Sequence, residues 1–182
     1  MLVTISGEPG SGKTTVATML ADRLGVPHVY AGDLYRREAK RRGLSLEEFN
    51  RLCESDHSVD RKLDQDMSAR ARAGRCILEG RLAGHLAAQD GLDALKVWVT
   101  ASDEVRARRV AQREHGDWRQ VEKENRERHA SDARRYREIY GFDLADTDVY
   151  DLVLHSDDLT PEQLVDELVE RVRERFPPAE GT

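Results

Sequence analysis

A glycine-rich turn near the N-terminus constrains the fold more than any other feature of this sequence. Residues 7–14 read G-E-P-G-S-G-K-T and match the pattern G-x-x-x-x-G-K-[ST] at every position. A short apolar run, residues 2–5, precedes the turn, and apolar residues at helical spacing follow it as far as Gly25. This order predicts a buried parallel strand, a loop that wraps a phosphate chain, and a helix that ends at Gly25.

The chemistry of phosphate binding explains the residue types in this turn. Glycines let the backbone turn so tightly that successive N–H groups point inward, and the helix N-terminus adds partial positive charge. Lys13 can bridge the β- and γ-phosphate oxygens of ATP, and Thr14 offers a hydroxyl group to Mg²⁺. We therefore predict a nucleotide site at this turn. The predicted ATP-binding residues are Gly7, Pro9, Gly10, Ser11, Gly12, Lys13, Thr14 and Thr15.

Several other classes of protein are disfavoured by what the sequence lacks. A GTPase needs a guanine-reading Asn-Lys-x-Asp motif, but Asn50 and Asn125, the only asparagines, are each followed by arginine. Motor and helicase ATPases need a larger domain than 182 residues provide. The formal charge of −6 argues against a protein that coats nucleic acid or an anionic membrane.

The chain also lacks the marks of secretion, membrane insertion or zinc binding. No apolar run is long enough to span a bilayer, and Cys53 and Cys76 have no zinc-ligand spacing. We therefore expect a cytoplasmic monomer that acts on small nucleotides and binds neither nucleic acid nor membrane.

The rest of the chain alternates short apolar strands with charged helices. This alternation predicts one α/β domain over residues 1–176, with a parallel sheet covered by helices on both faces, and a flexible tail over residues 177–182. Further strands are expected at residues 26–30, 76–78, 95–100 and 152–154. Further helices are expected at 34–53 with a break at Gly43, and at 59–73, 102–113, 118–140 and 161–176.

Four segments in a fixed order carry a family resemblance. Beside residues 5–15, they are A-G-D-L-Y-R at 31–36, L-E-G-R-L-A-G at 78–84, and residues 136–143 leading to Y-D-L-V at 150–153. Together they resemble the nucleoside monophosphate kinases, most of all the short archaeal-type cytidylate kinases. The resemblance extends from Ile5 to about Thr160.

This resemblance implies both a fold and an activity. The fold would be the three-layer sandwich of a P-loop kinase, with five parallel strands, a helical nucleotide-binding insert at about 34–74 and a short lid at about 113–119. The activity would be in-line transfer of a phosphoryl group from ATP to CMP, and also to dCMP, with Mg²⁺ as cofactor. Alternatives are an AMP, UMP or small-metabolite kinase on the same fold, or an ATP-dependent switch module in RNA processing.

The resemblance also assigns acceptor-side residues. Arg36 would hold the acceptor phosphate, and Asp33 would lie near the reaction centre or cap the helix that follows it. Glu79 would order water around Mg²⁺ at the end of its strand, and Arg81 would contact the pyrimidine. Because Leu82 replaces an acidic residue found in many bacterial relatives, Asp60 and Asp64 are alternative readers of cytosine. The sequence alone does not decide whether Arg81 or these aspartates read the base.

Arginines cluster in one stretch of the chain, residues 106–137. Of the 29 basic residues 24 are arginine, and ten of these fall within residues 106–137, where planar side chains can grip phosphate oxygens in pairs.

Arg128, Asp132 and Arg135 share one helix face by their spacing of four and three residues. In the resembling family such arginines clamp phosphate and the aspartate takes ribose hydroxyls, whereas a plain i,i+4 salt bridge is the alternative. Arg109 and Arg113 match an adenine-stacking arginine and a lid arginine. Lys13, Arg113 and Arg128 are thus the predicted catalytic residues.

Overall fold

A central five-stranded parallel sheet organises the chain, of which the computed structural model describes residues 1–177. The strand order is β2-β3-β1-β4-β5, so β1 lies in the middle. The strands are β1 (Leu2–Gly7), β2 (His28–Tyr30), β3 (Cys76–Glu79), β4 (Leu95–Thr100) and β5 (Leu152–His155). Every residue of β1 is buried, as expected for a strand with a neighbour on each side and helices on both faces. The parallel five-stranded sheet is therefore confirmed.

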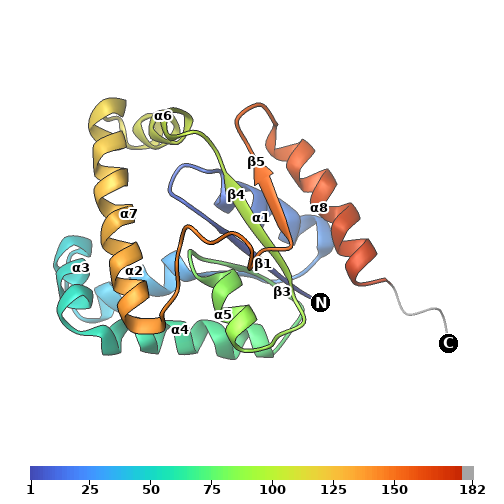
Figure 1. The fold of residues 1–182 in the computed structure, drawn as a ribbon, viewed down its shortest axis with the longest axis horizontal. Helices are drawn as coiled ribbons and strands as arrows, with labels where there is room; N and C mark the ends of the chain where they lie inside the picture. Colours follow the sequence, from blue (N-terminus) through green and yellow to red (C-terminus); the bar gives the residue numbers. More distant parts are fainter. Residues whose placement is uncertain (178–182) are drawn as a thin grey trace.

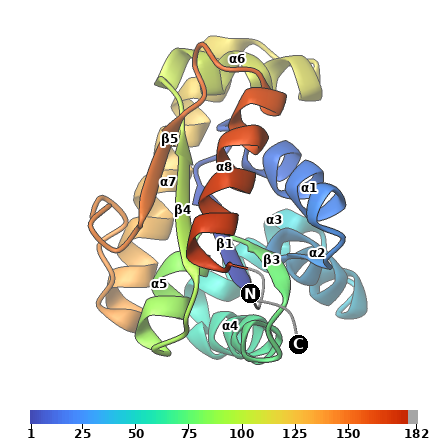
Figure 2. The ribbon, with the colours of Figure 1, turned by 90° about the vertical axis from the view of Figure 1, so that its right-hand side faces the viewer.

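Two apolar clusters form because side chains alternate between the faces of a strand. Val3 and Ile5 of β1 face α1 (Lys13–Leu24) and α8 (Pro161–Arg175). Leu2 faces the other way, toward α4 (His57–Arg72) and α5 (Ala83–Gln89). Helix, sheet and helix thus make three layers, and Figure 2 shows α8 and α1 on one side of the sheet.

The remaining helices surround the carboxyl ends of the strands. They are α2 (Ala31–Arg41), α3 (Leu46–Ser55), α6 (Asp103–Glu114) and α7 (Trp118–Tyr140). In Figure 1, α7 runs along one side of the molecule, with α6 at one of its ends and α2, α3 and α4 around the other. The predicted insert therefore corresponds to α2, α3 and α4, and the predicted lid to the junction of α6 with α7.

Several helices begin or end at the capping residues that the sequence predicted. Ser45 and Glu48 form a reciprocal capping box at the start of α3, and Gly25 ends α1 in the left-handed conformation. Between α6 and α7, His115 takes a φ of 56° and ends α6 at the predicted break.

Two expectations about local structure were wrong. The helix α5 was not predicted, because its seven residues lack a charged face that would give a helical pattern. Asp33 does not cap the helix that follows it, because α2 begins at Ala31 and places Asp33 in its first turn. Of the predicted tail, residues 178–182 lie outside the described part of the chain. Among the described residues, no helix combines the length and apolar character needed to cross a membrane.

Candidate active site

The loop between β1 and α1 takes a conformation that requires glycine. Gly10 has a φ of 82°, and a Cβ atom at this position would lie 2.3 Å from the carbonyl oxygen of Arg106. Gly12 has a φ of 88° and directly precedes the first turn of α1. The hydroxyl of Ser156 donates to the carbonyl oxygen of Ser11 at 2.8 Å and ties the loop to the segment after β5. The loop is therefore held in one tight shape beside a helix N-terminus, where a phosphate group binds.

Lys13 lies in a strongly basic environment at the start of α1. Burial lowers the pKa of Lys13 to about 8, and Glu79 opposes this change. The guanidinium groups of Arg81, Arg128 and Arg113 also contribute to this lowered pKa. These residues come from four different segments of the chain, so the fold gathers cations around the phosphate-binding loop.

Glu79 connects three elements at the carboxyl edge of the sheet. Its side chain is fully buried at the end of β3, and Thr14 of α1 donates to its Oε1 at 2.6 Å. The imidazole Nε2 of His28 lies 3.0 Å from Oε2 of the same carboxylate. His28 was not among the predicted site residues. Its position at the start of β2, one strand away from Glu79, explains the contact.

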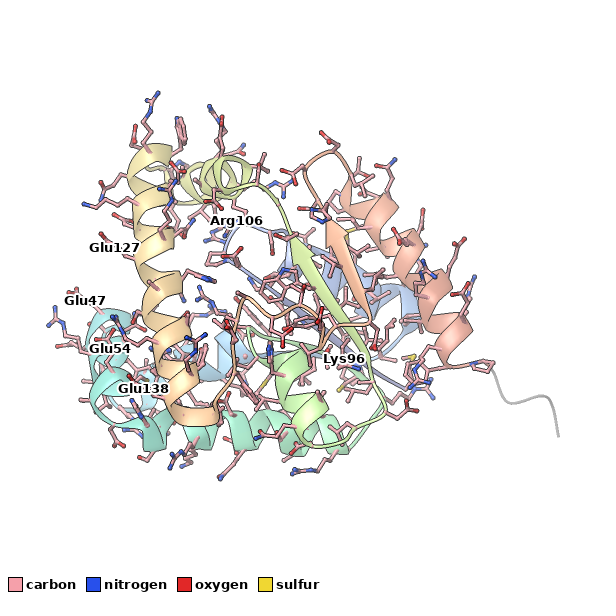
Figure 3. All side chains as sticks on the ribbon, in the orientation of Figure 1. Glu47, Glu54, Lys96, Arg106, Glu127 and Glu138 are labelled. Atoms are coloured by element: carbon pink, nitrogen blue, oxygen red, sulfur yellow. The ribbon has the colours of Figure 1, made fainter. Side chains whose placement is uncertain are left out.

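A large cleft opens above this edge of the sheet. Its volume is 1970 Å³, and its walls come from the phosphate-binding loop, from α2 to α4, and from α6 and α7. Figure 3 labels Glu47 and Glu54 of α3 and Glu127 of α7, all of which line the cleft. The hydroxyl of Ser131 on α7 donates to Glu54 at 3.0 Å, which joins the two walls. This volume exceeds the range of about 300 to 1,000 Å³ that is usual for the site of one small ligand, so the cleft has room for two.

Most predicted site residues line this cleft, although they are scattered in sequence. Gly7, Ser11, Asp33 and Glu79 do not line it. Those that do are Pro9, Gly10, Gly12, Lys13, Thr14, Thr15, Arg36, Asp60, Asp64, Arg81, Arg109, Arg113, Arg128, Asp132 and Arg135.

A network of opposite charges forms the wall opposite Lys13. Asp132 pairs with Arg81 and, at 3.0 Å, with Arg135 of the same helix. Arg135 Nε in turn lies 3.2 Å from Oδ2 of Asp60 on α4. Buried charges are kept where they are paired, and this network pairs charges from α4, α7 and the segment after β3 along the cleft.

Comparison with known proteins assigns the chain to a family. The model of the cytidylate kinase-like family matches residues 2–158. The chain belongs to this family.

Curated relatives are similar in sequence to this chain over most of their length. A cytidylate kinase of Methanococcoides burtonii is 48% identical over 157 residues, covering 86% of this chain and 87% of that protein. A cytidylate kinase of Methanopyrus kandleri is 44% identical over 161 residues, covering 85% of this chain and 83% of that protein. The resemblance inferred from the four motifs is confirmed.

Solved structures support the P-loop kinase fold. An uncharacterized protein from Eubacterium ventriosum superposes with a TM-score of 0.73 at 16% identity and covers 94% of this chain and 98% of that one. A shikimate kinase from Bacteroides thetaiotaomicron superposes with a TM-score of 0.60 at 15% identity and covers 96% of each chain. At such low identity these likenesses concern the fold alone.

In this member of the cytidylate kinase-like family, Arg36 and Asp33 form a pair of their own. Arg36 donates to Asp33 at 2.6 Å, and its guanidinium lies over the ring of Tyr30, 5.0 Å from the ring centre. Both side chains are about half exposed, and only Arg36 of the two lines the cleft.

The two arginines of α6 differ in how firmly they are held. Arg109 donates to the hydroxyl and the carbonyl oxygen of Ser156, at 2.8 and 2.6 Å. Arg113 is mostly exposed and pairs with its neighbour Glu114 at 2.6 Å. Arg109 is thus fixed beside the phosphate-binding loop, whereas Arg113 lies at the outer part of the cleft.

Arg128 is free of the salt bridge that its helical spacing suggested. Asp132 pairs with Arg81 and Arg135 instead, and within residues 1–177 no carboxylate lies within salt-bridge distance of Arg128. The i,i+4 alternative is therefore wrong, and Arg128 lines the cleft with its charge unpaired by the described residues.

Asp64 has an unusual environment deep in the insert. The hydroxyl of Tyr140, at the end of α7, donates to Asp64 at 2.5 Å. Burial, aided by the negative charge of Asp60, raises the pKa of Asp64 to about 6, although the hydrogen bond from Tyr140 opposes this change. Tyr140 was not a predicted site residue, since one tyrosine at a helix end carries no motif.

Proposed function

We propose that this chain transfers the γ-phosphoryl group of ATP to CMP, producing ADP and CDP. The observation that carries the proposal is the cleft itself, which faces a complete phosphate-binding loop with a buried arginine–aspartate network. The archaeal relatives, which share nearly half of their residues with this chain, are named cytidylate kinase.

ATP would bind at the glycine-rich loop, with its phosphates between the loop amides and Lys13. Thr14 and Glu79 supply oxygen atoms next to this position, and oxygen donors are what Mg²⁺ prefers. We therefore assign Mg²⁺ to Thr14 directly and to Glu79 through water. When bound, Mg²⁺ neutralises charge on the phosphate oxygens. Arg109, which lies next to Gly10 and Gly12, would stack on the adenine.

CMP would bind between the insert and α7. We assign Arg36 to its phosphate, because this arginine lines the cleft from the first turns of α2. Asp132 and Arg135 would take the ribose and phosphate, and Arg81 the pyrimidine, with Asp60, which lies 3.2 Å from Arg135, as an alternative reader of the base. Asp33 and Asp64 remain supporting candidates.

The reaction needs positioning and charge neutralisation more than acid–base chemistry. A phosphate oxygen of CMP, already an anion at neutral pH, forms a bond to the γ-phosphorus as the bond to the ADP oxygen breaks. Lys13, Arg113 and Arg128 would neutralise the charge that spreads over the transferring group. The insert, about 34–74, and the lid, about 113–119, would close over the substrates and exclude water that would hydrolyse ATP. We expect the enzyme to act as a cytoplasmic monomer.

A substrate panel tests this function directly. ADP release is measured by a coupled assay with CMP, dCMP, UMP, AMP and shikimate as acceptors, each at several concentrations. We expect the highest kcat/KM with CMP, with dCMP second. A preference for AMP or shikimate would overturn the proposal, and ATP hydrolysis stimulated only by RNA would indicate a switch module instead.

A further inference from the structure

Glu8 of the phosphate-binding loop points away from the nucleotide cleft. It is absent from the cleft lining and instead lines a separate cavity of 420 Å³ between β4, α6 and α7. Its two carboxylate oxygens have different partners. Oε2 lies 3.1 Å from Arg106 on α6, and Oε1 lies 3.0 Å from Nδ1 of His129 on α7. One carboxylate therefore joins the loop to both helices.

The Arg106 side of this contact is firmly fixed. Arg106 is only 8% exposed, donates from Nε to the carbonyl oxygen of Ala101 at 3.1 Å, and pairs with Asp103 at 2.5 Å. Its own carbonyl oxygen is the atom that a Cβ at Gly10 would meet, so loop and helix backbones touch here. Figure 3 labels Arg106 between α6 and the loop that follows β1. The loop and the start of α6 thus form one rigid unit.

The His129 side lies in the middle of the helix that carries the acceptor-side residues. His129 directly follows Arg128 and precedes Asp132 by three residues. A shift of α7 at His129 would move both of these residues relative to Lys13. Arg128 and Lys13 line the same cleft, so a displacement of α7 changes the distance between these two cations.

We infer that the contact of Glu8 with His129 positions α7, and with it Arg128, above the phosphate-binding loop. ATP bound at the loop is thereby coupled through Glu8 to the position of α7. Glu8 and His129 are positioning residues, because neither lines the nucleotide cleft. The expected effect on kcat rests on the proposed function. The mechanical part of the inference, the coupling of the loop to α7, requires only that the chain binds ATP.

A double-mutant cycle measures the catalytic consequence. Glu8→Gln and His129→Gln should each lower kcat about tenfold, which lies within the usual coupling range of residues in contact. The double variant should lose no more than Glu8→Gln alone, because Glu8→Gln already removes the contact that His129→Gln removes. His129→Lys again places an N–H donor opposite Glu8 and should recover kcat to within about threefold of the wild type.

The control is Lys123→Gln, which removes an exposed pair with Glu127 from the same helix at 3.9 Å. It should change kcat by less than about twofold, because exposed pairs contribute little. Melting temperatures from circular dichroism show whether each variant is folded at the assay temperature. Losses that multiply in the double variant, or a failure of His129→Lys to recover kcat, would overturn the positioning role.

Hydrogen–deuterium exchange tests the mechanical part without any phosphoryl transfer. A non-hydrolysable ATP analogue should slow amide exchange along α7 in the wild type, but not in Glu8→Gln, although calorimetry shows that the analogue still binds. Equal protection of α7 in both proteins, or none in the wild type, would refute the coupling. If the wild type makes no CDP, the proposed function is wrong, but the exchange measurement still shows whether Glu8 couples ATP binding to α7.

Discussion

The burial of Lys13, together with the cations around it, predicts that the charge of this lysine destabilises the folded protein. Its pKa falls from 10.5 to about 8, and one pKa unit corresponds to about 1.4 kcal/mol, so holding its charge at neutral pH costs about 3 kcal/mol. Replacing Lys13 with methionine keeps the apolar stem and removes the charge. It also removes a hydrogen bond to the Glu8 carbonyl oxygen, which contributes about 1 kcal/mol.

We therefore expect Lys13→Met to raise the free energy of unfolding by about 1 to 3 kcal/mol at pH 7 while abolishing ATP binding. The assay is urea denaturation followed by circular dichroism, at several pH values from 7 to 10.5. Between the folded pKa near 8 and the unfolded value of 10.5, the unfolded wild type binds more protons, so its stability rises with pH. The advantage of Lys13→Met should accordingly shrink across this range.

The matched control is Lys62→Met on the exposed surface of α4, which should change stability by less than about 0.5 kcal/mol. If Lys13→Met is no more stable than the wild type at pH 7, the reasoning about buried charge is wrong. It is equally wrong if the difference between the two proteins stays constant up to pH 10.5.

Three further predictions concern other parts of the cleft and the core. Arg128→Ala should lower kcat for CDP formation by about 10³-fold, as removal of an arginine finger does, and should leave the melting temperature unchanged. A loss below tenfold would show that Arg128 has no catalytic role. Asp64→Asn should match the wild type in stability near pH 4 and exceed it by about 1 to 3 kcal/mol at pH 7, because the raised pKa makes wild-type stability fall between pH 3.8 and about 6. Urea denaturation that gives the same stability difference between the two proteins at pH 4 and pH 7 would contradict this. Gly84→Ala should cost about 1 to 3 kcal/mol, since its Cβ would lie 2.3 Å from the Tyr150 ring, whereas Gly116→Ala, with only an ordinary contact at 3.6 Å, is the control.

Features that depend on neighbouring residues in sequence were predictable. The glycine-rich loop is specified by its own eight residues, because the same short segment supplies the amides, the lysine and the hydroxyl. The capping box of Ser45 and Glu48 is equally local, and so is the start of α8 at Thr160 and Pro161. In each case the physical cause lies within one turn of the chain.

Features that depend on how distant elements meet were not predictable in detail. Helical spacing grouped Asp132 with Arg128 and Arg135, but only the packing of α7 near the end of β3 reveals that Arg81 takes the place of Arg128. Glu8 occupies a variable position of the loop motif, so its partner His129 has no sequence signal at all. Such pairings arise from the tertiary fold, which spacing along one chain does not describe.

The packing of α1 against α8 couples the nucleotide site to the last helix of the chain. The apolar face of α1, including Val16 and Leu20, is covered by Leu164 and Leu168 of α8. During synthesis on the ribosome, the loop and α1 are made first, but the apolar face of α1 stays exposed to solvent until residues 161–176 emerge. The phosphate-binding loop and its helix are therefore packed in place only after α8 has been made.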